Sequence, residues 1–146
     1  MEIKQLTKLT DEIVIAFENL MPQLVNDYTI SLPNLFAVLN SKNTFLYVAE
    51  ENGEIIGTLT LIIYTIPSGK KASIEDVVVD YNMRGNGIAR KMIHYAIDQA
   101  NSMGIEKIDL TSSPYRVEAN ALYQSIGFLK RTTNVYRFEL KKHDIF

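Results

Sequence analysis

The stretch IEDVVVDYNMRGNGIARKMI, residues 74–93, joins an apolar run to an amphipathic pattern through a loop that contains two glycines. The run up to Asp80 is rich in β-branched residues and predicts a strand. Beyond the loop, Ile88, Met92 and Ile93 begin an apolar stripe at steps of three and four, which predicts a helix that stops at Gly104. The loop therefore connects a strand to a helix, either as a plain turn or as a cradle for phosphate groups.

The residues of this loop are compatible with both readings. Arg84, Gly85, Asn86 and Gly87 come directly before the helix. The first turn of a helix leaves four backbone N–H groups without partners, and its dipole adds partial positive charge there. Glycines let that backbone come close to a bulky anion such as a pyrophosphate. Because the pattern is neither G-x-G-x-x-G nor a P-loop, RGNG alone leaves the turn and the cradle equally open.

Upstream of this junction, the sequence predicts one short strand and two helices. The segment EIKQL, residues 2–6, is expected to form the first strand. Thr10 can cap a first helix that Pro22 kinks or ends. Ser31 and Pro33 are typical of the start of a second helix.

Strands dominate the middle of the chain. Asn52-Gly53 separates two segments rich in β-branched and aromatic residues, which is a strong signal for a hairpin. The turn PSGK at residues 67–70 leads into the strand that ends at about Asp80, so three or four antiparallel strands are predicted.

After the helix at the glycine loop, IEKIDLT predicts another strand, and a strand–helix–strand passage favours parallel pairing. VEANALYQSI is a short helix closed by Gly127, and NVYRFEL, residues 134–140, predicts a last strand. The predicted fold is therefore α/β (α+β), with a mixed, mostly antiparallel central sheet and helices on both faces, in a single domain over residues 1–146.

The composition narrows the function classes. The 146 residues are 47% hydrophobic and 22% charged with a net charge of −2, which fits a globular domain and favours neither nucleic acid nor an anionic membrane as partner. The absence of cysteine excludes disulfides, thiolate metal sites and cysteine nucleophiles. His94 and His143 do not cluster, so no metal site is predicted. Since no signal peptide or membrane span is recognisable, a cytoplasmic protein is expected.

Two further positions are candidates for chemistry. Asn120 and Tyr123 are three apart and share one face of the predicted helix, where Tyr123 could donate a proton and Asn120 could bind an amide. The alternative is that Tyr123 is a half-buried packing residue and Asn120 a solvated one.

Glu75 lies within the strand before the loop. Regular alternation would place Glu75, Val77 and Val79 on one face of the sheet and Ile74, Asp76 and Val78 on the other. A carboxylate among apolar neighbours can have a raised pKa and act as a base. A solvated residue near the start of a strand is the alternative.

Together these features resemble the GNAT superfamily of acetyl-coenzyme A-dependent N-acetyltransferases over nearly the whole chain. Arg84, Gly87 and Ala89 fit the family's R/Q-x-x-G-x-G/A signature after the strand VVVD. NALYQSIGF is similar to the family's later helix with its tyrosine, and VAEENGEIIGTLTL to the hairpin of its second and third strands. The order and separation of the three segments make the resemblance specific.

The resemblance implies that acetyl-CoA lies in a split between the parallel strands that carry Val79 and Leu110, and that no metal is needed. An amine would attack the thioester directly, with Glu75 as the base and Tyr123 as the acid for the leaving thiolate. The backbone of Val77 would polarise the thioester carbonyl. The positions carried over as cofactor contacts are Val77, Val78, Val79, Arg84, Gly85, Asn86, Gly87, Ile88, Ala89, Arg90, Asn120 and Tyr123.

The acceptor stays open at the level of sequence. The resemblance implies a small-molecule or peptide amine and allows a homodimer. IEDVVVD with RGNG is most similar to the glucosamine-6-phosphate acetyltransferase branch, but members with unknown amine substrates share similar strings. Tyr28, Tyr64, Tyr115 and Arg116 are candidates for lining an acceptor pocket or are ordinary surface residues. A non-catalytic module that binds acyl-CoA is the alternative function.

Overall fold

The fold is described from a computed structural model of the chain, for residues 1–140; His143 lies outside the described residues. The chain divides into two compact units, Met1–Thr111 and a second that begins at Ser112, and each is described by itself.

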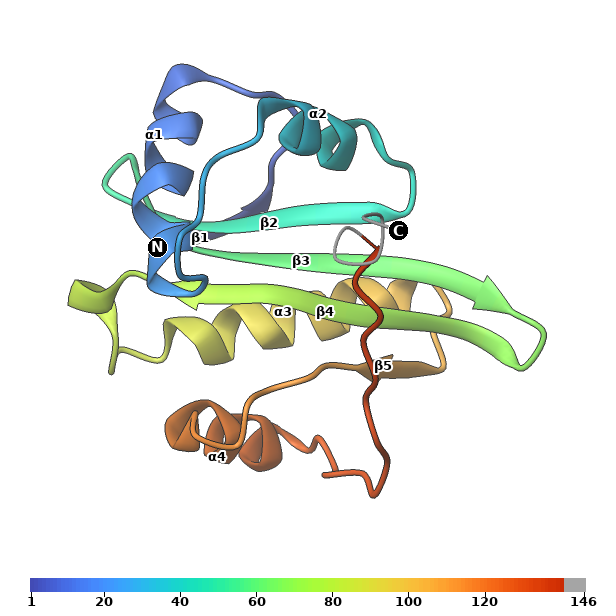
Figure 1. The fold of residues 1–146 in the computed structure, drawn as a ribbon. Coiled ribbons are helices and arrows are strands. Elements are labelled where there is room, and N and C mark those ends of the chain that lie inside the picture. The colour runs from blue at the N-terminus through green and yellow to red at the C-terminus, as the bar shows by residue number, and fades with distance from the viewer. Residues whose placement is uncertain (141–146) are drawn as a thin grey trace. The chain divides into compact units, whose positions relative to one another are not determined.

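The first unit is built on a five-stranded sheet with the order β1-β2-β3-β4-β5 (Figure 1). The four antiparallel strands and the one parallel strand confirm the predicted mixed sheet, and both turn residues of the hairpin at Asn52-Gly53 have positive φ, 53° and 79°. The strands are β1 (Glu2–Gln5), β2 (Thr44–Glu51), β3 (Glu54–Ile66), β4 (Gly69–Val79) and β5 (Lys107–Asp109), the last parallel to β4.

The two N-terminal helices begin where their caps predict. The side chain of Thr10 accepts a hydrogen bond from the Ile13 N–H at 3.3 Å at the start of α1 (Asp11–Leu20). The helix then tightens into a 3₁₀ turn, η1 (Met21–Gln23), which contains Pro22. Ser31 caps α2 (Leu32–Asn40) in the same way as Thr10 caps α1. Local capping chemistry therefore determines where each of these two helices begins.

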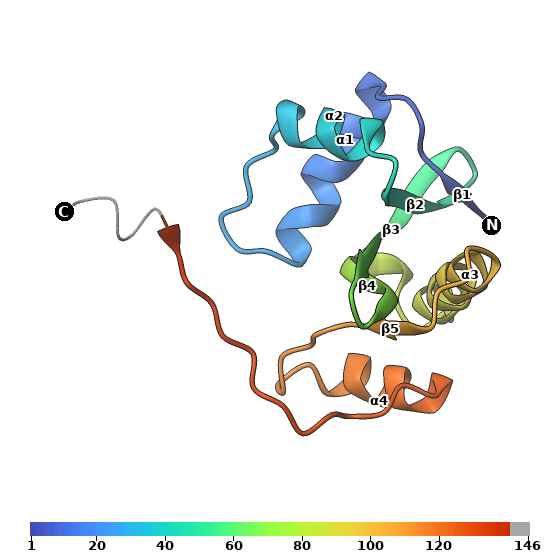
Figure 2. The same ribbon diagram turned by 90° about the vertical axis from the view of Figure 1, so that its right-hand side faces the viewer.

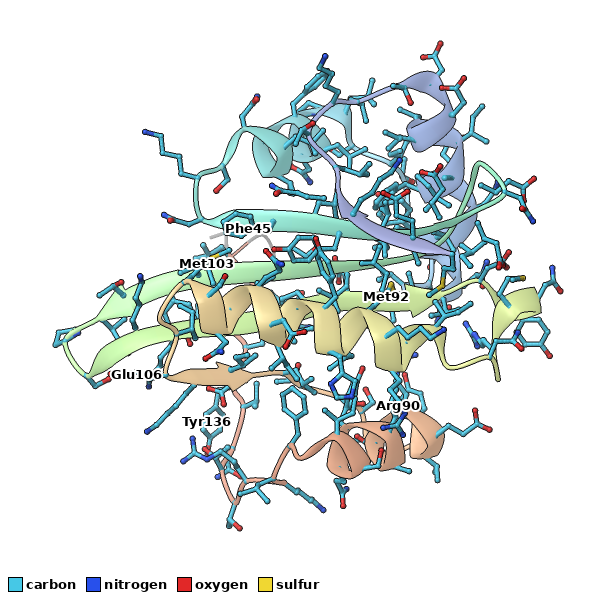
Figure 3. The ribbon with its side chains drawn as sticks, turned by 180° about the vertical axis from the view of Figure 1, so that it is seen from behind. Phe45, Arg90, Met92, Met103, Glu106 and Tyr136 are labelled. Carbon is cyan, nitrogen blue, oxygen red and sulfur yellow. The ribbon has the colours of Figure 1, made fainter. Side chains whose placement is uncertain are left out.

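Helices cover both faces of the sheet, as predicted. Helices α1 and α2 lie on one face and α3 (Ile88–Ser102) on the other (Figure 2). Met92 of α3 lies against the sheet, where its Cε would be 3.1 Å from a β-carbon at Gly57 (Figure 3). The residues buried on the first face include Phe17, Leu20, Leu35, Leu46, Val48 and Val78, and those of α3 are Ile88, Met92, Ile93, Ala96 and Ala100.

A β-bulge interrupts β4 and corrects the predicted alternation. Thr60 of β3 opposes Glu75 and Thr58 opposes Val78, so two residues of β4 stand opposite one of β3. Asp76 within the bulge has a φ of 51°. Because a bulge adds one residue to one strand, Glu75 and Val78 fall on the same face of the sheet, whereas regular alternation would separate them.

The second unit contains helix α4 (Val117–Ile126), which ends at Gly127 with a φ of 126°, as predicted. The predicted last strand over residues 134–140 is wrong, since no strand is assigned among the described residues 112–140. Val135 and Tyr136 of this segment are exposed. Alternating apolar residues provide strand propensity, but a strand also requires a neighbouring edge, which the pattern does not specify.

Candidate active site

The carboxyl-terminal half of β4 has an edge that β5 leaves open. The two parallel strands pair only from Lys71–Lys107 to Ser73–Asp109, whereas β4 continues to Val79. This geometry within the first unit is the splayed parallel pair that the sequence analysis expected. The backbone groups of such an edge are available to an extended chain. Of the three predicted contact residues on this part of β4, Val77 is half-buried and Val78 and Val79 are buried.

The strand leads through a 3₁₀ turn, η2 (Tyr81–Met83), into the glycine loop at the start of α3. Gly85 and Gly87 have φ values of 84° and 75°, and a β-carbon at either position would have no heavy atom within 4 Å. The N-cap of α3 is Gly87, which has no side chain that could accept hydrogen bonds from the first-turn N–H groups. The loop therefore presents an open surface next to the first-turn N–H groups of α3.

The three residues that begin α3 are also among the predicted cofactor contacts. Ile88 is buried under the helix, Ala89 is half-buried and Arg90 is exposed on the first turn (Figure 3). Small and apolar side chains at the first two positions leave the backbone at the helix start uncovered, and the dipole adds partial positive charge there. The positive φ values of both glycines and the open surface fit an anionic group at this place.

Arg84 and Asn86 hold the loop in shape. The Arg84 Nε donates a hydrogen bond to the carbonyl oxygen of Val79 at 3.0 Å, and its guanidinium lies 5.4 Å from the centre of the Tyr81 ring. The Asn86 Nδ2 donates to the carbonyl oxygen of Met83 at 3.0 Å. Both side chains thus bind the backbone of the junction, a positioning role that the sequence pattern did not indicate.

Gln23 is a further residue of the junction that the sequence analysis missed. Its Oε1 accepts a hydrogen bond from the Tyr81 N–H at 2.7 Å, and its Nε2 donates to Asp80 Oδ1 at 3.4 Å. Gln23 ends η1 and so lies next to the connection between α1 and α2. A lone glutamine after a helix carries no sequence signal for a partner 58 positions away.

Glu75 is solvent-exposed, and its Oε1 accepts a hydrogen bond from the hydroxyl of Ser73 at 2.8 Å. It opposes Thr60 in the ladder, so it lies on the face that α1 and α2 cover. Its predicted role as the base stays a prediction.

A pocket of about 180 Å³ opens on that same face of the first unit. Apolar side chains from α1, α2 and β2, among them Phe17, Leu35 and Leu46, form part of its wall. Tyr28, from the connection between the two helices, lines it together with Asp76 of the bulge. Tyr28 is thus one predicted acceptor-pocket candidate that does line a pocket.

The electrostatics of the pocket are governed by its carboxylate. Asp76 is exposed to solvent, but partial desolvation by the pocket raises its pKa above the ordinary value, and the neighbouring charge of Glu75 raises it further. Burial also raises the pKa of the Tyr28 phenol, with a smaller contribution from the charge of Asp76. Tyr28 and Asp76 are therefore close enough to interact, and Tyr28 stays protonated at neutral pH.

In the second unit, α4 carries Asn120 and Tyr123 one turn apart, as predicted. The Asn120 Nδ2 donates to the carbonyl oxygen of Ser113 at 3.0 Å. The half-buried Tyr123 ring meets Phe128 edge-on, with the ring centres 6.1 Å apart. Burial raises the pKa of Tyr123, against a smaller lowering effect of Arg116, so the phenol keeps its proton at neutral pH.

Comparison with known proteins decides the family. The family model described as "Acetyltransferase (GNAT) family" matches residues 10–128. The chain belongs to the GNAT acetyltransferases. The mixed sheet and the four α-helices assigned within residues 1–140 are the GNAT fold, and the glycine loop lies inside the matched region.

Relatives of this GNAT chain include an uncharacterised N-acetyltransferase, YjgM, of Escherichia coli, which is 29% identical over 104 residues, 69% of this chain and 62% of that protein. Glucosamine 6-phosphate N-acetyltransferase of Arabidopsis thaliana is 30% identical over 92 residues, 61% of this chain and 60% of that protein. The matched segments thus span less than two thirds of these relatives.

A crystal structure of the aminoglycoside acetyltransferase meta-AAC0020, from an uncultured soil metagenomic sample, has a TM-score of 0.84 at 22% identity and 95% coverage of both chains. At this identity the likeness shows the fold alone.

Two kinds of feature were not found among residues 1–140. No group of three or more His, Cys, Asp or Glu side chains is arranged to hold a metal ion. No helix in this part of the chain is long and apolar enough to cross a membrane. His94 lies exposed on α3.

Proposed function

We propose that this protein is an N-acetyltransferase that moves the acetyl group of acetyl-CoA directly to a primary amine of a small molecule or peptide, within a ternary complex. The observation that carries the proposal is the continuity of two features in one compact unit. The open edge of β4 runs through η2 into a glycine loop at the N-terminus of α3. One ligand with an extended amide-containing arm and a pyrophosphate matches both features.

The residues fit acetyl-CoA as follows. The backbone of Val77–Val79 would pair with the extended arm, and the N–H groups from Gly85 to Arg90 would hold the pyrophosphate. Open space beside both glycines supports this assignment, because a β-carbon there would stand where the anion must approach. Arg84 and Asn86 would act by keeping the loop in shape.

Acetyl-CoA supplies the reactive thioester, and the protein's side chains move the protons. An ammonium with a pKa near ~10 cannot attack at neutral pH, so Glu75 would remove its proton directly or through water. The N–H of Val77 would polarise the carbonyl. As the N–C bond forms and the C–S bond breaks, Tyr123 would give its proton to the sulfur, with Asn120 binding a cofactor amide or orienting that tyrosine. A chain without cysteine suits direct attack.

The test is a panel of primary amines with release of coenzyme A as the readout, followed by mass spectrometry of the protein after incubation with acetyl-CoA alone. The proposal expects amine-dependent release and no acetylated enzyme. A stable acetyl-enzyme that forms without amine would contradict direct transfer. Tight acetyl-CoA binding with no release for any amine would favour the non-catalytic binding module.

A further inference from the structure

We propose that the acceptor is a compact primary amine with one ammonium group and an apolar body, bound in the pocket beside the bulge with its ammonium against Asp76. This inference rests on the proposed acetyltransferase function and names the substrate class of that site. The first observation in support of this inference is the side of the sheet on which the Asp76 side chain lies. Regular alternation would put Asp76 on the face of Ile74, which is buried toward α3.

The bulge directs Asp76 elsewhere. The extra residue between the Thr60–Glu75 and Thr58–Val78 pairs lets its side chain line the pocket on the opposite face. Its φ of 51° lies in the left-handed region, which aspartate tolerates better than most residues. Strained backbone positions of this kind cluster at ligand sites.

The charge of the pocket selects for a cation. Asp76 is the one acidic residue among the described residues that line it, and none of these is Lys, Arg or His. Glu75 lies next to it in the chain and adds negative charge, and Tyr28 faces it from the connection between α1 and α2. An ammonium is complementary to this arrangement, whereas a phosphate would find no cationic partner among the described lining residues.

Much of the remaining wall suits a small apolar body. Phe17, Leu35, Val38 and Leu46 line the pocket together with neutral polar side chains, those of Thr29, Ser31, Asn34, Thr58 and Thr60. An engineered apolar cavity of ~150 Å³ in another protein takes up benzene, so a volume of about 180 Å³ fits a group of about that size. An arylalkyl or branched alkyl amine meets both requirements. The phosphate of an amino-sugar phosphate would find no cation among these lining residues, and the large hydroxylated rings of an aminoglycoside do not match the apolar part of the wall.

The experiment measures steady-state acetylation of 2-phenylethylamine and isopentylamine against glucosamine 6-phosphate and sisomicin. The expected result is a kcat/KM at least tenfold higher for the two monoamines. A preference for glucosamine 6-phosphate or sisomicin would overturn the inference while leaving the proposed function intact. Failure of the protein to bind acetyl-CoA would instead contradict the proposed function itself.

Variants locate the amine. Asp76→Asn should raise the KM for 2-phenylethylamine at least tenfold and leave the Kd of acetyl-CoA unchanged. Asp27→Asn is the matched control, because Asp27 also has a left-handed φ, 57°, and does not line the pocket. An unchanged KM in Asp76→Asn would overturn the proposal.

A second variant keeps the test independent of the stability of Asp76→Asn. Asn34 lines the pocket from the exposed first turn of α2, so Asn34→Lys adds a cation at the surface. It should weaken binding of 2-phenylethylamine at least tenfold in equilibrium titrations with coenzyme A present. If the wild-type protein does not bind this amine, or if Asn34→Lys binds it equally well, the assignment is wrong.

Discussion

The side-chain oxygen of Gln23 accepts a hydrogen bond of 2.7 Å from the backbone N–H of Tyr81, 58 positions away. Gln23 also donates to Asp80, so one amide binds the two residues that follow β4. The same residue ends η1, where the connection that contributes Tyr28 to the pocket begins. A single side chain thus couples the wall of the pocket beside the bulge, the proposed acceptor site, to the turn before the glycine loop.

Gln23→Ala should lower the free energy of unfolding by about 1–2 kcal/mol, because it removes hydrogen bonds and leaves the Tyr81 N–H without its side-chain partner. It should also raise the KM for both amine and acetyl-CoA, since it loosens both loops. Urea unfolding and steady-state kinetics check this. Gln5→Ala on the exposed side of β1 is the control, and equal behaviour of the two variants would contradict the coupling.

Elements with a local cause could be predicted from the sequence. Thr10 and Ser31 determine helix starts through their own side chains, and Asn52-Gly53 determines a hairpin through positive φ. The glycine loop was found for the same reason, since its chemistry lies in consecutive residues.

Features that depend on distant partners could not be predicted. The bulge at Asp76 arises from how β4 pairs with β3, and alternation assumes a ladder without insertions. The pocket combines residues from the helices, their connection and three strands, so no segment shows it. Gln23 has no local signal, and residues 134–140 have a strand pattern without a strand.

Tyr123→Phe should reduce kcat by about 100-fold or more, the usual contribution of a general acid, with little change in the Kd of acetyl-CoA. Because burial raises the pKa of Tyr123, the wild-type protein should keep this contribution beyond the ordinary tyrosine range. A pH–rate profile of both proteins tests it, with Tyr136→Phe at an exposed position as the control. Identical profiles for Tyr123→Phe and wild type would remove Tyr123 as the acid.

Glu75→Gln should slow acetylation most at neutral pH, where the amine is protonated and a base is needed. The deficit should shrink as the pH approaches the amine's own pKa, because neutral amine then becomes abundant. Glu54→Gln, in the exposed hairpin, is the matched control. A deficit that does not change with pH would assign proton removal to a group other than Glu75.

Asp76→Asn should stabilise the protein without ligand at neutral pH. Since the pKa of Asp76 is raised in the folded state, the folded protein holds this proton more tightly than the unfolded chain. The free energy of unfolding of the wild type therefore falls as the pH rises from the pKa of Asp76 in the unfolded chain to its higher pKa in the folded protein. Asparagine does not ionise, so Asp76→Asn avoids this fall.

Urea unfolding at pH 3 and pH 7.5 measures this effect. The difference between variant and wild type should be largest at the higher pH and nearly absent at the lower one. Asp27→Asn serves again as the control. A variant less stable than wild type at pH 7.5 would show that ionised Asp76 contributes to folding, contrary to its raised pKa.

The most direct test of the central claim is calorimetric titration of acetyl-CoA into the wild-type protein, Gly87→Asp and Gly53→Asp. Gly87 and Gly53 both have left-handed φ and open surroundings, so the two variants share the same backbone penalty and added charge. The account predicts that wild type and Gly53→Asp bind acetyl-CoA and that Gly87→Asp does not. At a ligand concentration of 100 times the Kd, the free energy of unfolding of the two binding proteins should rise by about 2.7 kcal/mol. Absence of binding to wild type, or undiminished binding to Gly87→Asp, would contradict it.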